Sequence, residues 1–317
     1  MSGVISVKKR IKYNKLKTKK KRICSPMVKK KGLINKESCL TPNILILIKK
    51  EFNKVNPPNN RINSDNIKEI WYELKKKMNC NKNSFDDCWY NKIKNIELRN
   101  KIEKYIFAPT HPKSWNKNPN EWLSNYDILK ILKQYEITYP YFKFFEPTTI
   151  DFDLKLSKNR CISDELCNIN IIDYIRNKKS EFGFIFNLDT HEGGGTHWVS
   201  LYFSFTDKYI FYFNSSGESI PKEIRDLKNR IIKQINDKTS EIIKFYQNAP
   251  YDHQKGNNEC GMYSLYFITT MLTKKIDNKL VDISTLIKYF KGKYNGRITD
   301  KKMNDMRWNL FNSPKTI

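Results

Sequence analysis

The sequence predicts an α+β protein with a mainly helical N-terminal arm and a second domain built around a sheet. Short runs rich in aromatic and β-branched residues, separated by turn formers, indicate consecutive strands at residues 182–188, 197–205 and 209–214. An apolar stripe at helical spacing over residues 220–235 and an almost wholly apolar run over 260–268 indicate two helices, the second of them buried. Helices packed against a mainly β half are the most economical architecture for this order of elements.

Three polar residues lie at the ends of these elements. Pro221 marks the start of the first helix, and residues 242–246 indicate a further strand after it. His197 then lies at the start of a strand, Asn214 at the end of the next, and Cys260 at the start of the buried helix. The order His, Asn, Cys supplies the parts of a cysteine-protease site.

The chemistry of a thiol explains why these residue types belong together. A free Cys with a pKa of about 8.5 is only slightly ionised at neutral pH, so a hydrolase needs an adjacent base. We expect His197 to be that base and Asn214 to orient it. Unpaired N–H groups at the start of a helix stabilise an anion, which favours Cys260 as nucleophile. The side-chain amide of Gln254, six residues earlier, is the expected second oxyanion donor.

Each residue also has a purely structural interpretation. A Cys in an apolar helix is more often an inert core residue than a nucleophile. His197 and Trp198 taken singly are typical of a sheet core, and Asn214 followed by two serines and a glycine is typical of an ordinary turn. The joint spacing favours the catalytic interpretation. His253 is the reserve base, and His191 is expected to be a loop residue.

The run His197-Trp198-Val199 and the placement of Gln254 six residues before Cys260-Gly261 resemble the ubiquitin-like (SUMO) protease and adenovirus proteinase superfamily. The asparagine and the glycine-rich approach at 193–195 are most similar to polyprotein-processing proteases of large cytoplasmic DNA viruses, of the African swine fever virus type. The resemblance covers residues 110–275. Trp122-Leu123 is similar to the motif that opens the catalytic domain in SUMO proteases.

The resemblance implies a role for each matching position. Cys260 corresponds to the nucleophile, His197 to the base, Asn214 to the third triad member and Gln254 to the oxyanion donor. Trp198 corresponds to an aromatic wall beside the scissile bond, which implies cleavage after small residues, often Gly-Gly. There are two departures. Asn214 replaces the Asp of SUMO proteases, which weakens a deSUMOylating interpretation, and Glu259 replaces an Asp.

Length and charge indicate three segments within the 317 residues. Residues 1–33 are expected to form a disordered basic tail, because they hold many bases and few large apolar side chains. Residues 34–108 are expected to form a helical arm domain. Residues 109–317 are expected to form the cysteine protease domain, with the proline-containing stretch 109–119 as linker.

The formal net charge is +26, which suggests non-specific DNA binding through the basic tail. Lysines that reflect an AT-rich coding bias are the alternative explanation. No apolar run is long enough to span a bilayer, and no signal peptide is visible. Seven cysteines without CxxC or metal spacing favour reduced thiols, and we expect neither metal nor cofactor.

The leading hypothesis is a viral cysteine endopeptidase that processes structural or core precursor proteins through a thioester. It would act in the host cytoplasm at the viral factory and in the virion. A protease that removes SUMO or another ubiquitin-like modifier is the second hypothesis. A basic, DNA-associated packaging or scaffold protein with an inactive protease fold is an alternative of another class.

Overall fold

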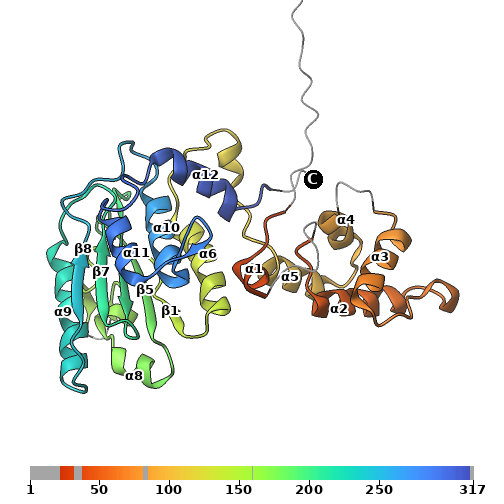
Figure 1. Ribbon diagram of the computed structural model, residues 1–317, viewed down its shortest axis with the longest axis horizontal. Coiled ribbons are helices and arrows are strands. Elements are labelled where there is room, and N and C mark those ends of the chain that lie inside the picture. Colours follow the sequence, from red (N-terminus) through yellow and green to blue (C-terminus); the bar gives the residue numbers. More distant parts are fainter. Residues whose placement is uncertain (1–21, 32–37, 81–84, 159, 315–317) are drawn as a thin grey trace, which may run out of the picture. The chain divides into compact units, whose positions relative to one another are not determined.

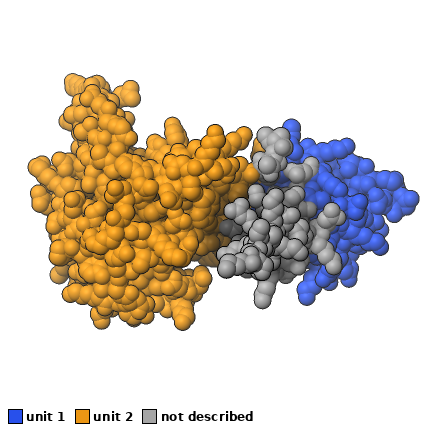
Figure 2. Space-filling view, turned by 90° about the horizontal axis from the view of Figure 1, so that it is seen from above, with its two compact units in different colours: residues 1–22, 34–99 blue, residues 23–33, 100–317 orange. Residues whose placement is uncertain are grey.

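The structure is a computed structural model that describes residues 22–31, 38–80, 85–158 and 160–314. The chain forms two compact units, coloured separately in Figure 2. The first comprises residues 1–22 and 34–99, and the second comprises residues 23–33 and 100–317. None of the described helices combines the length and apolarity that a membrane crossing requires.

The first unit is helical, as expected for an N-terminal arm. Its elements are α2 (Pro42–Lys54), the short 3-10 turn η1 (Pro58–Asn60), α3 (Ile67–Lys77) and α4 (Phe85–Lys92), and α5 (Ile96–Tyr105) crosses the division between the units. Helices α2 and α3 pack together through their buried apolar side chains. The Asn53 amide closes the connection between them, because it both donates to and accepts from the backbone of Ile62.

Part of the expected disordered tail is ordered. Residues 1–21, 32 and 33 lie outside the described residues, but Pro26–Lys31 form helix α1, which packs against α6 (Asn125–Thr138). Val28 is fully buried there, and the Ser25 hydroxyl donates to the Tyr105 carbonyl at 2.6 Å. The predicted disorder therefore does not extend to residues 22–31, since a single apolar side chain and a capping serine anchor this lysine-rich segment.

The second unit is built around a six-stranded mixed sheet with the order β1-β5-β6-β7-β8, with β2 beside β5 (Figure 1). Its strands are β1 (Phe142–Phe144), β2 (Thr148–Thr149), β5 (Glu181–Asn187), β6 (Trp198–Ser204), β7 (Tyr209–Phe213) and β8 (Lys244–Gln247). The three central strands are antiparallel neighbours, and β1, β2 and β8 pair in parallel. The strands expected from the sequence correspond to β5, β6, β7 and β8, with ends that agree within one or two residues.

Helices cover both faces of the sheet (Figure 1). Helix α9 (Lys222–Asn236) packs its buried stripe of Ile224, Leu227, Ile231 and Ile235 against one face. Helix α10 (Cys260–Thr273) lies on the other face with α6 and α11 (Ile283–Phe290). All residues of α10 from 260 to 272 are buried, which confirms the buried helix expected from its apolar run.

The remaining elements of this unit are short, apart from a C-terminal helix. They are η2 (Lys113–Asn116), β3 (Lys155–Ser157), β4 (Arg160–Cys161), α7 (Asp164–Cys167), α8 (Ile171–Arg176), β9 (Lys275–Ile276), β10 (Lys279–Leu280) and α12 (Asp300–Leu310). The expected linker at 109–119 is packed against α12. Trp115 is buried and contacts His111, Trp308 and Phe311 through its ring. Three prolines suggested a linker, but the aromatic residues between them decide its structure.

The expectation of reduced thiols is wrong for this structure. Six of the seven cysteines are disulfide-bonded, including the pairs Cys80–Cys88 and Cys161–Cys167, and Cys260 is free. The Cα atoms of the two pairs are 5.7 and 6.3 Å apart, within the separation that a disulfide spans. Sequence spacing did not reveal these pairs, because separations of eight and six residues match no disulfide or metal motif. Cys260 is therefore the only free thiol among the residues that the structure describes.

Candidate active site

Cys260 occupies the first position of α10 and is only 2% exposed. The next residue is a glycine because a Cβ there would lie 2.9 Å from the Leu123 Cβ. Burial raises the pKa of the Cys260 thiol, and the Glu259 charge adds to this, whereas backbone N–H groups of Trp198, Gly261 and Cys260 itself oppose the shift. The resting sulfur is therefore a neutral thiol at neutral pH, held among donors that would stabilise its anion.

The same contacts bring the sulfur to the strand that carries the predicted base. The Trp198 N–H that faces the Cys260 sulfur belongs to the residue directly after His197. Helix α10 lies along β6, on which Trp198 is the first residue. The fold thus joins two sequence positions more than sixty residues apart at one end of the sheet.

His197 and Asn214 are hydrogen-bonded through Nε2 and Oδ1 at 2.8 Å. The Ser216 backbone N–H also donates to Asn214 Oδ1, at 2.9 Å. Because a backbone N–H only donates, the atom that it contacts is an oxygen, and His197 Nε2 must carry the proton of its bond. The lone pair of the imidazole therefore lies on Nδ1. Burial lowers the pKa of His197. The ring is therefore unprotonated at neutral pH and can accept a proton.

Asn214 is fully buried at the end of β7 and is held by a second asparagine. Its backbone N–H donates to Asn248 Oδ1 at 2.9 Å, and Asn248 Nδ2 donates back to the Asn214 carbonyl at 2.7 Å. Asn248 Nδ2 also donates to the Tyr251 carbonyl. This pair of reciprocal hydrogen bonds fixes the position of Asn214, the residue that orients the base. Asn248 was not found from the sequence, since a lone asparagine after a strand is typical of any turn.

The glycine-rich approach to His197 is held by two polar side chains. Asn187 Oδ1 accepts from the Thr196 N–H at 3.0 Å, and Asp189 Oδ2 accepts from the Gly195 N–H at 2.9 Å. A Cβ at residue 193 would overlap the Asp189 carboxyl group, and Gly195 has a φ of +90°. The glycines therefore allow a tight loop that delivers His197 to the start of β6.

Gln254 has an amide orientation that leaves one donor available. Its Nε2 donates to the Gly256 carbonyl at 2.6 Å, and its Oε1 accepts from the Ser215 hydroxyl at 2.7 Å. Because a carbonyl oxygen only accepts, the nitrogen and oxygen of this amide are assigned. The second Nε2 hydrogen is the group that the oxyanion role requires. Ser215 follows Asn214 directly, so one turn supports both residues.

One face of α12 holds the loop that precedes the nucleophile. Asp300, Asn304 and Arg307 are spaced by four and three residues and therefore lie on one side of the helix. The Asp300 carboxylate accepts from the backbone N–H groups of Lys255 and Gly256.

At the other end of that loop, Arg307 Nη2 pairs with Glu259 Oε2 at 3.0 Å, and both side chains are buried. This arrangement was not predicted from the sequence, although the i, i+4, i+7 spacing of polar residues was the available signal. Glu259, noted as a departure from the expected Asp, thus has a buried partner.

Trp198, the predicted wall of the substrate channel, is 8% exposed. Its indole Nε1–H donates to the Leu123 carbonyl at 3.0 Å. The neighbouring Trp122 is 42% exposed. The Trp122-Leu123 pair therefore contributes a core side chain that packs on the start of α10 and an aromatic side chain that faces solvent.

His253 and His191 are bonded to groups outside the candidate site. His253 is fully buried, its Nδ1 accepts from the Ile298 N–H at 3.1 Å and its Nε2 donates to the Phe290 carbonyl at 2.8 Å. With both nitrogens bonded, it has no free lone pair for a reserve base. His191 pairs with Asp151 on an exposed loop at 2.6 Å.

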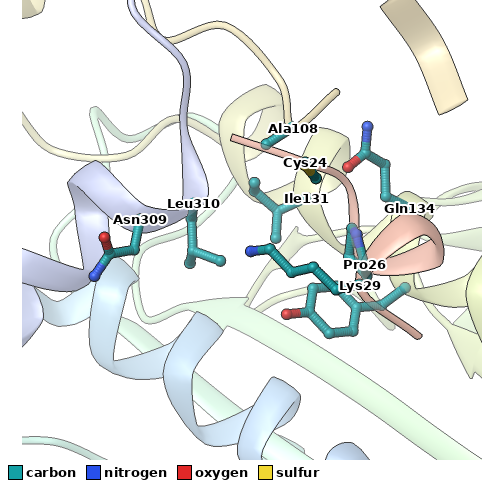
Figure 3. Close-up of a pocket in the computed structure, with 9 residues that line it drawn as sticks. Cys24, Pro26, Lys29, Ala108, Ile131, Gln134, Asn309 and Leu310 are labelled. Carbon is teal, nitrogen blue, oxygen red and sulfur yellow. The ribbon is translucent and has the colours of Figure 1, made fainter. Parts of the chain in front are cut away.

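The second unit contains a cleft and a small pocket. A cleft of about 270 Å³ adjoins the nucleophile, lined by Asn120, residues 256–259, Asp300, Lys301 and Asn304. A much smaller pocket, with room for about one water molecule, is lined by residues of α1, α6 and α12 that include Lys29, Ile131 and Leu310 (Figure 3). None of the candidate catalytic residues lines this second pocket, whereas the cleft adjoins the candidate site.

The chain is similar to known cysteine proteases. Residues 184–313 match the Ulp1 protease family, C-terminal catalytic domain. The chain is 30% identical over 189 residues to a protein named as a thiol protease from Acanthamoeba polyphaga mimivirus, covering 59% of this chain and 60% of that protein. It is 26% identical over 230 residues to a SUMO-1 cysteine protease of African swine fever virus, covering 70% of this chain and 77% of that protein.

A solved structure shares the fold. The crystal structure of the African swine fever virus protease aligns with a TM-score of 0.60 and 22% sequence identity, covering 93% of this chain and 97% of that chain. This confirms the expected α+β fold with a helical N-terminal region. The chain spans three fifths of the length of the mimivirus relative.

Proposed function

We propose that the chain is a cysteine peptidase of the Ulp1 protease family that cleaves viral structural or core precursor proteins after small residues of the Gly-Gly-X type. The observation that carries the proposal is the proton assignment at His197. Its Nε2–H is bonded to Asn214, which leaves the Nδ1 lone pair to accept a proton, and the backbone N–H of the next residue, Trp198, faces the sulfur of Cys260, the free thiol among the described residues.

In the proposed reaction the substrate carbonyl carbon is attacked by the Cys260 sulfur while the thiol proton passes to His197 Nδ1. The negative charge that develops on the carbonyl oxygen is stabilised by the Cys260 backbone N–H and the free Nε2 hydrogen of Gln254. His197 then gives its proton to the leaving amine, and the acyl group remains as a thioester. A water molecule, deprotonated by His197, attacks the thioester and releases the carboxylate and the thiol.

The surroundings of Cys260 support a narrow site for small residues. Leu123 packs on Gly261, so the exposed ring of Trp122 is placed near the nucleophile, on the side where Trp198 closes the core. We propose that Trp122 and the edge of Trp198 together form the aromatic wall expected for such a channel. The cleft beside residues 256–259 would accommodate the polar part of the substrate chain.

Removal of SUMO or another ubiquitin-like modifier is the second candidate. It is favoured by the name of the African swine fever virus relative, a SUMO-1 cysteine protease. The two functions share the whole mechanism and differ only in the protein that presents the scissile bond. The scaffold alternative requires a disused triad, whereas the bonded network around His197, Asn214 and Gln254 retains the groups that hydrolysis uses.

The net charge of +26 supports a further proposal of weak, sequence-independent DNA binding. We place the enzyme in the host cytoplasm at the viral factory and in the virion. DNA affinity is expected to fall steeply between 50 and 200 mM salt, by about tenfold or more. A binding isotherm that does not change over this range would remove the DNA proposal and leave the protease proposal unaffected.

The experiment that tests the protease proposal offers two substrates to the purified chain. One is a core precursor that contains Gly-Gly-X sites, and the other is a SUMO conjugate. Cleavage of the precursor by the native chain, lost in Cys260→Ala, supports maturation, and preferential cleavage of the conjugate supports the second candidate. Cleavage that survives in Cys260→Ala would refute both.

A further inference from the structure

The hydrogen-bond network does not end at Asn214. The neutral amide offers His197 a dipole and no net charge. The nitrogen of the same amide, Asn214 Nδ2, donates a hydrogen bond to Glu218 Oε2 at 3.3 Å. Two hydrogen bonds in series therefore connect the imidazole, through the Asn214 amide, to the Glu218 carboxylate.

The turn after β7 is built to return Glu218 to this amide. The Gly217 N–H donates to the Asn214 carbonyl at 2.9 Å, which closes the turn. Gly217 has a φ of +75°, and a Cβ there would lie 2.8 Å from the Tyr251 carbonyl carbon. Only glycine fits this position, so the backbone fixes the path from Asn214 to Glu218.

A carboxylate at this place acts on His197 by two routes. It polarises the amide, so that Asn214 Oδ1 becomes a better acceptor for the Nε2–H of the ring. It also acts directly by its charge, because Glu218 raises the pKa of His197 against the larger lowering by burial. Glu218 is exposed, so salt screens its charge and its effect is modest.

The other charged and titratable groups near the base have their own partners. Cys260 is a neutral thiol, and Glu259 is paired with Arg307. Asp189, in the loop before β6, is bound to the Gly195 N–H. Tyr212 on β7 is neutral, since burial raises its pKa far above neutrality. Glu218 is therefore the carboxylate that the network connects to the base.

We propose that Glu218 is a positioning residue that strengthens the basicity of His197 and fixes its orientation through the amide of Asn214. The triad would then be a relay of Cys260, His197, Asn214 and Glu218, in which the negative charge lies one residue further from the imidazole than in a triad with a carboxylate. The inference rests on the proposed function, since it assigns His197 the role of base.

The first test compares Glu218→Gln with a matched control, Glu223→Gln, in the exposed first turn of α9. In Glu218→Gln the acid limb of the profile of kcat/KM against pH should move to lower pH, and kcat/KM should fall about threefold to tenfold, as for an exposed charge. Adding 0.5 M NaCl should move the native acid limb in the same direction and leave the variant unchanged. Profiles of the native protein and Glu218→Gln that superimpose at both salt concentrations would overturn the inference.

The second test moves the charge. In Asn214→Asp, two carboxylates would face each other where the amide N–H now donates to Glu218, so activity should fall. In the double variant Asn214→Asp with Glu218→Gln, the new amide can donate to the new carboxylate. We expect the double variant to be about tenfold more active than Asn214→Asp alone. Equal activity of the two would contradict the coupling.

A readout without substrate separates this inference from the proposed function. NMR titration of the imidazole resonances follows His197 among only four histidines. Glu218→Gln should lower the pKa of His197, and Glu223→Gln should leave it unchanged. A chain that cleaves nothing but shows this shift would refute the protease proposal alone. A chain that cleaves its substrate but shows no shift would refute the role of Glu218.

Discussion

At the residue scale, the site is a neutral pair in its resting state. Burial raises the pKa of Cys260 and lowers that of His197, and both shifts oppose a preformed thiolate and imidazolium. The sequence suggested a sulfur ionised by its neighbour, and the structure corrects this. Backbone donors of Trp198, Gly261 and Cys260 stabilise the anion only as it forms, when the proton moves to Nδ1. The site is thus organised for general-base catalysis at the moment of attack.

This state predicts a particular dependence on pH. His197 must be neutral to act, and its lowered pKa places the acid limb of kcat/KM below the ordinary histidine value of about 6.5. Because the pKa of Cys260 is raised, the rate of alkylation by iodoacetamide should keep rising above pH 9. Stopped-flow or mass-spectrometric rates between pH 4 and 10 measure both. Alkylation that is fast and constant from pH 5 to 8 would indicate a preformed ion pair instead.

A second residue predicts the dependence of stability on pH. Glu181 is buried at the start of β5, accepts from the hydroxyls of Tyr202 and Ser204, and burial raises its pKa to about 7. The folded state binds the proton more tightly than the unfolded state, so its contribution to stability is complete below about pH 4.5 and is lost as pH rises through 7.

Glu181→Gln should therefore gain stability relative to the native protein between pH 5 and 8. Urea unfolding at four pH values, with Glu223→Gln as control, measures the difference. A constant difference across this range would show that Glu181 does not titrate there.

At the element scale, most of the site follows from patterns visible in the sequence. The strand runs and the apolar helix place His197, Asn214 and Cys260 at element ends, because periodicity identifies strongly patterned segments well. The residues that hold the candidate catalytic side chains in place were harder to predict from the sequence. Asn248, Asn187 and the polar face of α12 act through contacts distant in sequence, and their residue types are common in loops and on exposed helices. Tertiary partners decide their roles, and the sequence gives no local sign of these.

The polar face of α12 yields a prediction for Arg307. Its guanidinium pairs with Glu259 and lies 4.4 Å from the centre of the Trp115 ring, with no exposure to solvent. Arg307→Met should lower the free energy of unfolding by about 3–5 kcal/mol, since it leaves Glu259 buried without a counter-charge.

The control is Lys301→Ala, which removes the exposed pair with Asp305 on the same helix and should change stability by less than about 1 kcal/mol. Chemical denaturation measures the free energy of unfolding of both variants. Similar small losses in both would show that the pair does not anchor the loop before Cys260.

At the scale of the whole molecule, the free thiol and the bonded cysteines define the chemistry available to the chain. Six cysteines are disulfide-bonded and Cys260 is free. Counting cysteines could not predict this, since neither the pair Cys161–Cys167 nor the pair Cys80–Cys88 belongs to a recognisable motif. The linker expected at 109–119 failed for a similar reason, because Trp115 packs on the C-terminal helix. The helical N-terminal region and the sheet that comes after it in the chain were predicted from composition and pattern.

The cysteine arrangement predicts the outcome of a thiol count. Without reductant, an excess of iodoacetamide should add one label to the native chain and none to Cys260→Ala. After denaturation and reduction, the native chain should take seven. Intact-mass spectrometry measures each state. Several labels on the native, unreduced chain would show that the bonded cysteines are reduced in solution.

The most direct measurement of the central claim is the site and rate of reaction with a Gly-Gly peptide vinyl sulfone, read by intact-mass and peptide-mapping spectrometry. The account predicts one adduct per chain on Cys260, formed rapidly in the native protein and at least about a hundredfold more slowly in His197→Ala. An adduct on another residue, or equal rates in the native chain and the variant, would contradict it.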